Sequence, residues 1–491
     1  MYFLGYDVGS SSIKASLIEG STNELIASSQ SPTTELSMIA HQPGWAEQEP
    51  STWWSHIIKA THDILSSSSI DSREIKAIGI SYQMHGLVMV DKELSELRPS
   101  IIWCDSRAIP YGNRAEEILG QDYCQKVTLN APGNFTVAKL AWVKEHEPSI
   151  YARCHKMMLP GDYIALKLSG EATTTHSGLS EGIMYDFVKN QISEEVLSAL
   201  DIDKDLIPRI VPTFGEQTKL SKSAADELGL PIGTPITYRA GDQPNNALSL
   251  NVLQPGELAA TAGTSGVIYG INDTLNNDHK SRVNAFAHVN HLPQKKRIGI
   301  LLCINGTGIL NAWIKNMTGS SGYEEMNSKA ASVPVGSDGV MTYPFGNGSE
   351  RVLENKNMGA AIHGLQFNRH DQGHLYRSAQ EGIACALTYG TEIMTDIGIR
   401  CETLKAGQAN LFLSDIFQTT LANLTGATIE LYNTDGAQGA ARGAGIGLGY
   451  YSFQDAFSGL HLRKRIEPNI KKKAQYQELY HRWKEHLVDT L

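Results

Sequence analysis

Apolar residues recur along the chain in short runs that end in small or polar residues. Residues 2–6 and 75–80 form two such runs. Their length, and the Gly, Ser and Asp residues that bound them, indicate buried strands. Between such runs the apolar period changes to three or four residues, which predicts helices over 51–65, with Ser51 as N-cap, and over 380–389. The alternation of the two patterns predicts an α/β protein.

The segment that joins the first two predicted strands carries the first candidate chemistry. Residues 7–12 read Asp-Val-Gly-Ser-Ser-Ser and form the tip of a hairpin whose second strand covers 13–18. Gly9 allows a positive φ, and the small residues let successive N–H groups point inward as in an anion nest. Asp7 is placed to hold Mg²⁺ or a water molecule. An ordinary hairpin turn is the alternative interpretation.

Residues 256–270 repeat this arrangement. An apolar strand again runs into a turn of Gly263, Thr264 and Ser265, and another apolar strand leaves it. Two similar hairpins at the starts of the two halves indicate an internally duplicated architecture whose lobes face each other. A nucleotide phosphate tail held between the two tips is a natural use of this symmetry.

One acidic residue lies in a turn near the middle of the chain. Asp242 follows a predicted strand over 235–238 and precedes an apolar run over 247–252 that starts a helix. It therefore lies at the carboxyl end of a strand, where open α/β sheets bind ligands. Asp242 is accordingly a candidate catalytic base. The alternative is that it caps the next helix or closes the turn.

Two further strand ends carry polar side chains. The strand over 75–80 runs into Gln-Met-His-Gly, which places His85 to bind a substrate rich in hydroxyl groups, unless it is a structural histidine. Asp105 and Arg107 follow the next apolar run, and they either form an ordinary salt bridge or bind substrate.

Three later segments complete the pattern. Residues 405–410 form a small-residue turn before a predicted helix over 411–424, which admits a flat ring or a phosphate. Residues 435–445 are rich in Ala and Gly and predict a closely packed helix rather than a dinucleotide-binding fingerprint. The charged segment 463–491 predicts a solvated amphipathic helix at the C-terminus.

Composition narrows the possible partners. A chain of 491 residues should divide into two or more lobes, and its net charge of -10 argues against nucleic acid or an anionic membrane as the main partner. Six cysteines without paired spacing indicate neither disulfides nor a zinc site. The start of the sequence bears on location. It has no basic, cleavable leader, and the chain has no apolar run of membrane-spanning length. We therefore expect a cytoplasmic protein.

Taken together, these motifs resemble the FGGY family of carbohydrate kinases, and within it the xylulokinases, over nearly the whole chain. The resemblance implies two actin-like ATPase (ribonuclease H-like) domains that form a cleft. It divides the chain into a sugar-binding domain (1–245), an ATP-binding domain (246–450) and a C-terminal helical segment (451–491). The segments that carry the resemblance are 7–12, 83–86, 134–143, 241–242, 262–266 and 360–365.

The resemblance also implies a reaction, in which the γ-phosphoryl group of ATP passes to the 5-hydroxyl of D-xylulose. Asp242 is the expected general base, and Mg²⁺ is expected near Asp7 and Asp242. Possible homodimerisation is a further expectation from the family. The expected sugar contacts are Met84, His85, Asp105 and Gln243. The expected ATP contacts are Gly9, Ser10, Ser11, Lys14, Gly263, Thr264 and Ser265 at the phosphates, and Gly407 and Asn410 at the adenosine.

The chain departs from the family pattern at three places. Gln243-Pro244 follows the catalytic Asp where the family has Asn, Ala406 replaces the first glycine of the adenosine loop, and residues 346–356 lack the Arg-Thr-Pro character common there. Three alternatives therefore stay open. They are an FGGY kinase for ribulose, gluconate or glycerol, an actin-like ATP-binding protein without sugar turnover, and an inactive paralogue.

Overall fold

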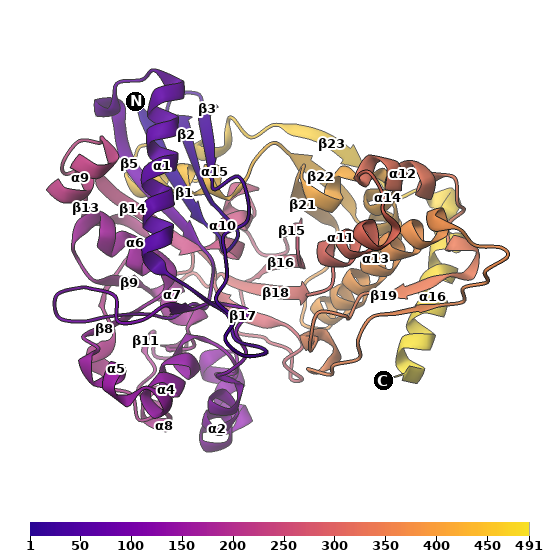
Figure 1. Ribbon diagram of the computed structural model, residues 1–491, viewed down its shortest axis with the longest axis horizontal. Helices are drawn as coiled ribbons and strands as arrows, with labels where there is room; N and C mark the ends of the chain where they lie inside the picture. The colour runs from indigo at the N-terminus through magenta and orange to yellow at the C-terminus, as the bar shows by residue number, and fades with distance from the viewer. Residues whose placement is uncertain (491) are drawn as a thin grey trace.

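The computed structural model describes residues 1–490, and Leu491 lies outside the described residues. Within them the chain forms two lobes, each built on one large sheet (Figure 1). The first sheet has the order β13-β14-β5-β1-β2-β3 and the second the order β17-β18-β16-β15-β21-β22-β23. The strands of the first are β1 (Tyr2–Val8), β2 (Ile13–Glu19), β3 (Leu25–Ser31), β5 (Ile75–Tyr82), β13 (Phe214–Lys219) and β14 (Pro235–Gly241). Those of the second are β15 (Leu258–Ala262), β16 (Gly266–Asn272), β17 (Asn284–Ala287), β18 (Ile298–Ile304), β21 (Thr403–Gly407), β22 (Thr428–Tyr432) and β23 (Leu462–Ile466).

The two sheets share one core topology. In the first, β1 pairs antiparallel with β2 and parallel with β5, which in turn pairs parallel with β14. In the second, β15 pairs antiparallel with β16 and parallel with β21, which pairs parallel with β22. The orders β3-β2-β1-β5-β14 and β18-β16-β15-β21-β22 therefore correspond strand by strand. This confirms the duplicated α/β architecture that the two hairpin loops predicted.

Helices cover both faces of the first sheet. On one face lie α1 (Pro50–Ser68), α6 (Pro160–Ser169) and α9 (Lys222–Leu228), and on the other α10 (Asp242–Ser249) and α15 (Gly436–Gly447). The chain enters α1 through Glu49 as N-cap and Pro50, so the expected cap at Ser51 is wrong. Proline favours the first helical position because its missing N–H has no partner there.

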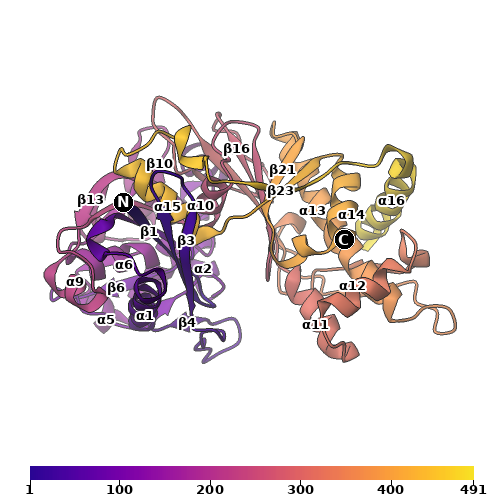
Figure 2. The same ribbon diagram turned by 90° about the horizontal axis from the view of Figure 1, so that it is seen from above.

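The helix predicted over 435–445 is α15, and it crosses from the second half of the chain to the first lobe (Figure 2). Its Ala and Gly residues let its backbone touch the sheet. A Cβ at Gly5 would lie 2.1 Å from the Ala437 carbonyl oxygen, and one at Gly79 would lie 2.0 Å from that of Ala440. Only glycine fits at these strand positions, so α15 is fixed directly above β1 and β5.

The second lobe carries α11 (Gly308–Thr318), α12 (Tyr323–Ala331), α13 (Gln372–Asp396), α14 (Asp415–Thr425) and α16 (Lys473–Thr490). The helix predicted over 380–389 is the middle of α13. The prediction of one helix over 463–491 is wrong at its start, because residues up to 466 complete β23 and α16 begins only at Lys473. The turn predicted over 405–410 is wrong at its start, because residues 405–407 complete β21. A 3₁₀ turn covers Asn410–Leu413, and α14 follows at Asp415.

Smaller elements fill the lower part of the first lobe. The helices there are α2 (Ile109–Leu119), α3 (Gln121–Tyr123), α4 (Thr136–His146), α5 (Pro148–Arg153), α7 (His176–Glu181) and α8 (Glu194–Ala199). Short strands accompany them at β4 (Glu47–Gln48), β6 (Val88–Val90), β7 (Ser100–Ile101), β8 (Lys156–Met158), β9 (Thr173–Thr175), β10 (Tyr185–Asp186), β11 (Gln191–Ile192) and β12 (Arg209–Val211). The second lobe has the further pair β19 (Met341–Tyr343) and β20 (Ala361–His363).

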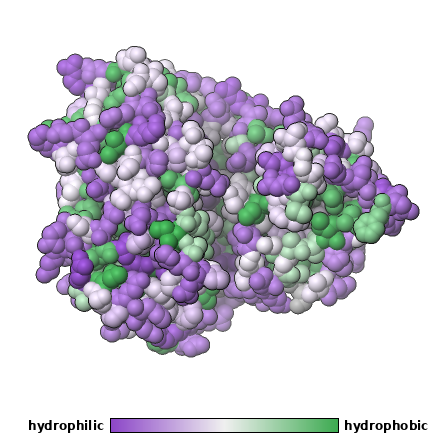
Figure 3. Space-filling view, in the orientation of Figure 1, coloured by the Kyte–Doolittle hydropathy of each residue, from purple (hydrophilic) through white to green (hydrophobic). Residues whose placement is uncertain are grey.

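The space between the lobes is hollowed (Figure 3). Below it the lobes touch through β17, where the Ser180 hydroxyl accepts a hydrogen bond from the Ala287 N–H at 2.8 Å and the Asn130 side chain donates to the Ala285 carbonyl at 2.5 Å. The expected domain boundaries stay predictions. The one at 245 falls within α10.

The described residues contain six free cysteines, as expected. No helix among residues 1–490 has both the length and the apolar character that crossing a membrane requires.

Candidate active site

Asp7 lies near the carboxyl end of β1. Its carboxylate accepts a hydrogen bond from the Ser81 hydroxyl at 2.7 Å, and Lys14 is its partner position on β2. The N-terminus of α15 lies directly against it, since a Cβ at Gly436 would be 2.3 Å from Asp7 Oδ2. Burial raises the pKa of Asp7, and the nearby charge of Asp435 adds to the rise while Ser81 and Lys14 oppose it.

The loop that follows Asp7 is a tight turn closed by its own backbone. The Gly9 N–H donates to the Ser12 carbonyl at 3.1 Å, and Gly9 does not adopt a positive φ, contrary to our expectation. The Ser10 carbonyl accepts from Gln48 at 2.7 Å, and the Ser10 hydroxyl accepts from the indole of Trp103 at 3.3 Å. Ser11 is exposed at the tip. The turn is thus anchored on one side and open at Ser11.

Asp242 is the first residue of α10, immediately after β14. The expectation that a helix begins at residue 247 is therefore wrong by five positions. Gly241, which has no side chain, is the N-cap, and Asp242 occupies the first helical position. The corresponding turn after β22 provides a contrast, because there Asp435 caps α15 by accepting the Gln438 N–H at 2.9 Å. Asp242 is therefore not the N-cap residue of its helix, although backbone N–H groups of the first turn interact with its carboxylate.

The environment of Asp242 disfavours its charged form. Burial raises the pKa of this carboxyl group and the negative charge of Asp7 raises it further, to about 7, although hydrogen bonding from Gln243 opposes the shift. The two carboxyl groups therefore interact, as expected if the ends of β1 and β14 meet at one edge of the sheet. A carboxyl group that titrates near neutral pH is suited to accept a proton.

His85 follows β5 in a left-handed conformation, with φ of 63°. Histidine is among the few non-glycine residues that tolerate this region, which is common at functional sites. Its Nδ1 lies 3.0 Å from the carbonyl oxygen of Glu181, which can only accept, so Nδ1 carries the proton. Burial lowers the pKa of His85 to about 3, and the ring is neutral. Nε2 is therefore a hydrogen-bond acceptor.

The second hairpin tip lies in the other lobe. The carbonyl groups of Gly263 and Thr264 accept from Gly308 at 2.9 Å and from Ile309 at 3.1 Å, so the loop rests on the N-terminus of α11. Ser265 lies beside Cys303, whose pKa burial raises to about 12 with a contribution from Asp242. The loop and Asp242 are therefore within electrostatic reach of each other.

The adenosine-loop residues lie next to this tip. Asn410, which has φ of 53°, places its amide nitrogen 3.5 Å from where a Cβ of Gly263 would be. Gly407 ends β21, and a Cβ there would lie 3.1 Å from the Thr434 carbonyl oxygen. The structure thus brings Asn410 together with the second loop, and Gly407 lies at the end of the neighbouring strand β21.

Comparison with known proteins places this arrangement in a family. The N-terminal domain model of the FGGY family of carbohydrate kinases matches residues 2–249, and the C-terminal domain model of the same family matches residues 258–450. The chain belongs to the FGGY family. The two-lobed actin-like fold expected from the resemblance is therefore confirmed.

Individual relatives agree with this assignment. The chain is 28% identical to a xylulose kinase of Escherichia coli over 444 residues, which cover 90% of this chain and 88% of the relative. Its structure resembles that of a xylulose kinase from Brucella ovis with a TM-score of 0.89 at 25% identity, covering 99% and 98% of the two chains. A gluconate kinase from Lactobacillus acidophilus matches with a TM-score of 0.88 at 22% identity, over 99% and 97%. This FGGY protein is an ATP-dependent carbohydrate kinase.

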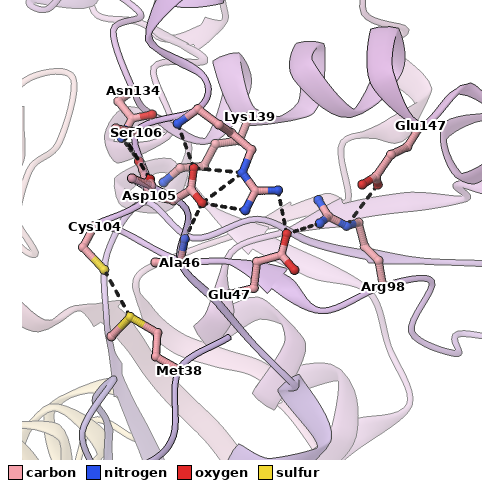
Figure 4. A network of polar contacts seen from close by, with 12 residues as sticks. Met38, Ala46, Glu47, Arg98, Cys104, Asp105, Ser106, Asn134, Lys139 and Glu147 are labelled. Atoms are coloured by element: carbon pink, nitrogen blue, oxygen red, sulfur yellow. Dashed lines mark hydrogen bonds and ion pairs between the residues drawn. The ribbon is translucent and has the colours of Figure 1, made fainter. Parts of the chain in front are cut away.

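Asp105 belongs to a buried ion-pair network in the first lobe of this FGGY kinase (Figure 4). Its carboxylate is completely buried and pairs with the Arg107 guanidinium at 2.7 Å, while the Ala46 N–H donates to it at 2.6 Å. Arg107 also pairs with Glu47 at 2.6 Å and stacks 3.7 Å from the ring centre of Trp45. The structure thus shows the salt bridge that the sequence left open, and a direct sugar contact of Asp105 stays a prediction.

Two residues that sequence reasoning missed contact the Gln-Met-His-Gly motif of residues 83–86, which we call the sugar motif for its proposed role. Lys139 is completely buried and donates from Nζ to the His85 carbonyl oxygen at 2.7 Å, and burial lowers its pKa to about 7. Lys139 lies inside the stretch 134–143 that resembles the family, so the sequence contained a signal that could have identified it. Glu181 is 2% exposed, and its Oε2 is 2.5 Å from the Cβ position of Gly241, next to Met84. Nothing in the sequence around Glu181 indicates that it lies beside Asp242.

The donor set at the cleft suits a magnesium ion carried by a nucleotide. Asp7 and Asp242 offer carboxylate oxygens, and their mutual repulsion is what a divalent cation relieves. Within residues 1–490 no group of three or more His, Cys, Asp or Glu side chains forms a metal site by itself. Mg²⁺ characteristically binds through one or two carboxylates together with substrate phosphates, so these two residues fit it.

Proposed function

We propose that the protein transfers the γ-phosphoryl group of ATP to the 5-hydroxyl of D-xylulose, with Asp242 as the general base. The observation that carries this proposal is the Asp242 carboxyl at the end of β14, which interacts with Asp7 and whose pKa of about 7 lies in the range a base needs. The choice of D-xylulose rests on the xylulose kinases among the relatives and on the Gln-Met-His-Gly motif.

The sugar lies against the first lobe. His85 accepts a hydrogen bond from a sugar hydroxyl at Nε2, because its Nδ1 proton is engaged with Glu181. Met84, which is 5% exposed, packs on the carbon face of the sugar. Gln243 follows the base directly and donates from its amide to a neighbouring hydroxyl. Asp242 accepts the proton of the attacking hydroxyl as that oxygen bonds to phosphorus.

ATP spans the two hairpin tips. Backbone N–H groups of residues 10–12 and of Gly263, Thr264 and Ser265 bind the phosphates, together with Lys14, while Gly407 and Asn410 line the adenosine side. The magnesium ion, when bound through Asp7 and Asp242, neutralises the charge of the β- and γ-phosphates. Since the ATP phosphates contact both lobes and the sugar lies against the first, closure of the lobes aligns the two substrates and excludes water, which limits ATP hydrolysis without sugar.

The test is sugar-dependent release of ADP with Mg²⁺ present, measured across D-xylulose, D-ribulose, D-gluconate and glycerol. We expect D-xylulose to give the highest kcat/KM, by at least tenfold. A preference for D-gluconate or glycerol would support the kinase reaction but contradict the assignment of D-xylulose as the substrate. Absence of turnover with every sugar would instead support an ATP-binding protein without sugar turnover or an inactive paralogue. Homodimerisation and a cytoplasmic location stay predictions.

A further inference from the structure

One arginine of the second lobe points at the sugar motif of the first. Arg351 lies in the 3₁₀ turn Arg351–Leu353, which packs against β18. Its guanidinium carbon is 5.9 Å from the ring centre of Phe135, which immediately precedes α4 of the first lobe. The Phe135 ring in turn meets the His85 ring edge to face, at 4.7 Å between centres. Arg351 thus reaches the first lobe beside His85.

A second aromatic ring from the second lobe completes this contact. Phe286, on β17, lies 5.3 Å from His85 and 5.8 Å from Phe135, measured between ring centres. The two phenyl rings come from different lobes, and both pack against the imidazole of His85. A hydroxyl-rich ligand that reaches His85 Nε2 therefore lies next to groups of the second lobe as well as the first.

The hydrogen-bonding capacity of Arg351 is largely unused. A guanidinium has five N–H donors and no acceptor. In residues 1–490 the structure records one hydrogen bond for it, from Nη1 to the Ser281 carbonyl oxygen at 3.3 Å, and no ion pair. Arg351 is nevertheless only partly exposed, and burial lowers its pKa. Its positive charge also lowers the pKa of His85, which shows that the two side chains are close electrostatic neighbours.

We propose that Arg351 binds sugar oxygens from the second lobe, beside His85, so that recognition of the sugar uses both lobes. The inference rests on the proposed function and extends it to a residue outside the sugar motif. The two side chains are complementary, because His85 Nε2 accepts a hydrogen bond and the Arg351 fork donates several. One hydroxyl, or two adjacent ones, can donate to His85 and accept from Arg351. A sugar held in this way draws the lobes together before phosphoryl transfer.

The test compares Arg351→Gln and Arg351→Lys with Arg369→Gln. Arg369 is an exposed arginine of the same lobe that pairs weakly with Asp338 at 3.7 Å, so its loss controls for a lost positive charge. We measure the Kd of D-xylulose by calorimetry, which needs no turnover, and the KM values for sugar and ATP. Arg351→Gln should raise the sugar Kd and KM at least tenfold and leave the ATP KM within twofold. Arg351→Lys, which keeps the charge and loses the fork, should give an intermediate value, and Arg369→Gln should match the wild type.

Closure of the two lobes on sugar binding provides a second, independent measurement of the role of Arg351. Saturating sugar should reduce the radius of gyration of the wild type in solution scattering, and Arg351→Gln should weaken this response at the same sugar concentration. A sugar Kd within twofold of the wild type in Arg351→Gln overturns the inference. If the glutamine variant does not fold, a sugar Kd within twofold of the wild type in Arg351→Lys overturns it equally. Failure of the proposed function is distinguishable, since the wild type would then turn over no sugar of the panel.

Discussion

The carboxyl groups of Asp7 and Asp242 interact across the ends of β1 and β14, and the charge of Asp7 helps to raise the pKa of Asp242 to about 7. The first effect is burial, which disfavours both charges, and the second is their mutual repulsion. The cleft thus concentrates negative charge where a nucleotide and its cation are to bind. Asp242 is left ready to accept a proton near neutral pH.

The pH dependence of catalysis should report this pKa. Because the basic form of Asp242 dominates only above its pKa, kcat/KM for the sugar should fall about tenfold per pH unit below pH 7 and level off above pH 8. Asp7→Asn removes the repelling charge and should move the pKa of Asp242 downward. The two pKa values are compared by carbon-13 NMR of labelled aspartate in the free proteins. An unchanged pKa of Asp242 in the Asp7→Asn variant would show that the two carboxyl groups do not interact.

Folding stability should show the cost of this carboxylate. Below pH 4 Asp242 is protonated in both the folded and the unfolded chain. Between pH 4 and 7 the unfolded chain loses this proton while the folded chain retains it, so the group destabilises the fold progressively as pH rises and fully above pH 7. Asp242→Asn should therefore stabilise the protein by about 1–3 kcal/mol at pH 8 and hardly at all at pH 4. Denaturant unfolding at the two pH values measures this. Equal effects at both would refute the shifted pKa.

His85 should act on the sugar and not on the nucleotide. His85→Ala removes the Nε2 acceptor and should raise the sugar KM about 10- to 100-fold, roughly the 1–3 kcal/mol of a buried group left without its partner, with the ATP KM unchanged. His279→Ala is the control, because His279 is exposed and bonds Gln125 at 3.1 Å, away from the motif. Steady-state kinetics with each substrate varied in turn decides the point. A sugar KM and kcat equal to those of the wild type would exclude the contact.

Asp105 should matter first for stability. Asp105→Asn removes one of the two carboxylates that pair with the buried Arg107 and leaves only Glu47, so the loss should approach that of breaking a buried pair, about 3–5 kcal/mol. The exposed pair of Asp201 with Lys144, at 2.5 Å, is the control, and Asp201→Asn should cost at most about 1 kcal/mol. Urea unfolding of both variants measures the difference. Similar small losses would mean that the network in Figure 4 contributes little.

Much of the fold could be predicted from local pattern. The apolar runs and the small-residue turns define strand, loop and strand on a scale of a few residues. Both hairpins form, although β1 continues to Val8, so that Asp7 lies in the strand and not in the predicted tip. Helix starts were less predictable. Pro50 displaced the cap from Ser51, and Asp242 begins α10 although the apolar run begins five residues later. Here a local backbone preference and the packing against a sheet override the apolar period.

Site residues could be predicted only where they lie in a short sequence motif. Asp7, Asp242 and His85 lie in short stretches with distinctive composition, and the fold brings them to the ends of neighbouring strands. Glu181 is different, because its carbonyl orients His85 and its side chain lies against Gly241 through contacts between residues about 60 and 96 positions apart. No local pattern encodes such a contact. It follows only from the way α7 packs below the sheet.

The proposed chemistry depends above all on Asp242 accepting the proton of the sugar hydroxyl. The most direct measurement is a single-turnover assay of phosphoryl transfer from labelled ATP to D-xylulose by Asp242→Ala, with ATP binding measured in parallel by calorimetry. We predict that transfer falls by at least a factor of about 1,000, on the order of 4 kcal/mol, while the Kd of ATP stays within about tenfold. Transfer at a rate near that of the wild type, with ATP bound equally well, would contradict the role of Asp242 as the base.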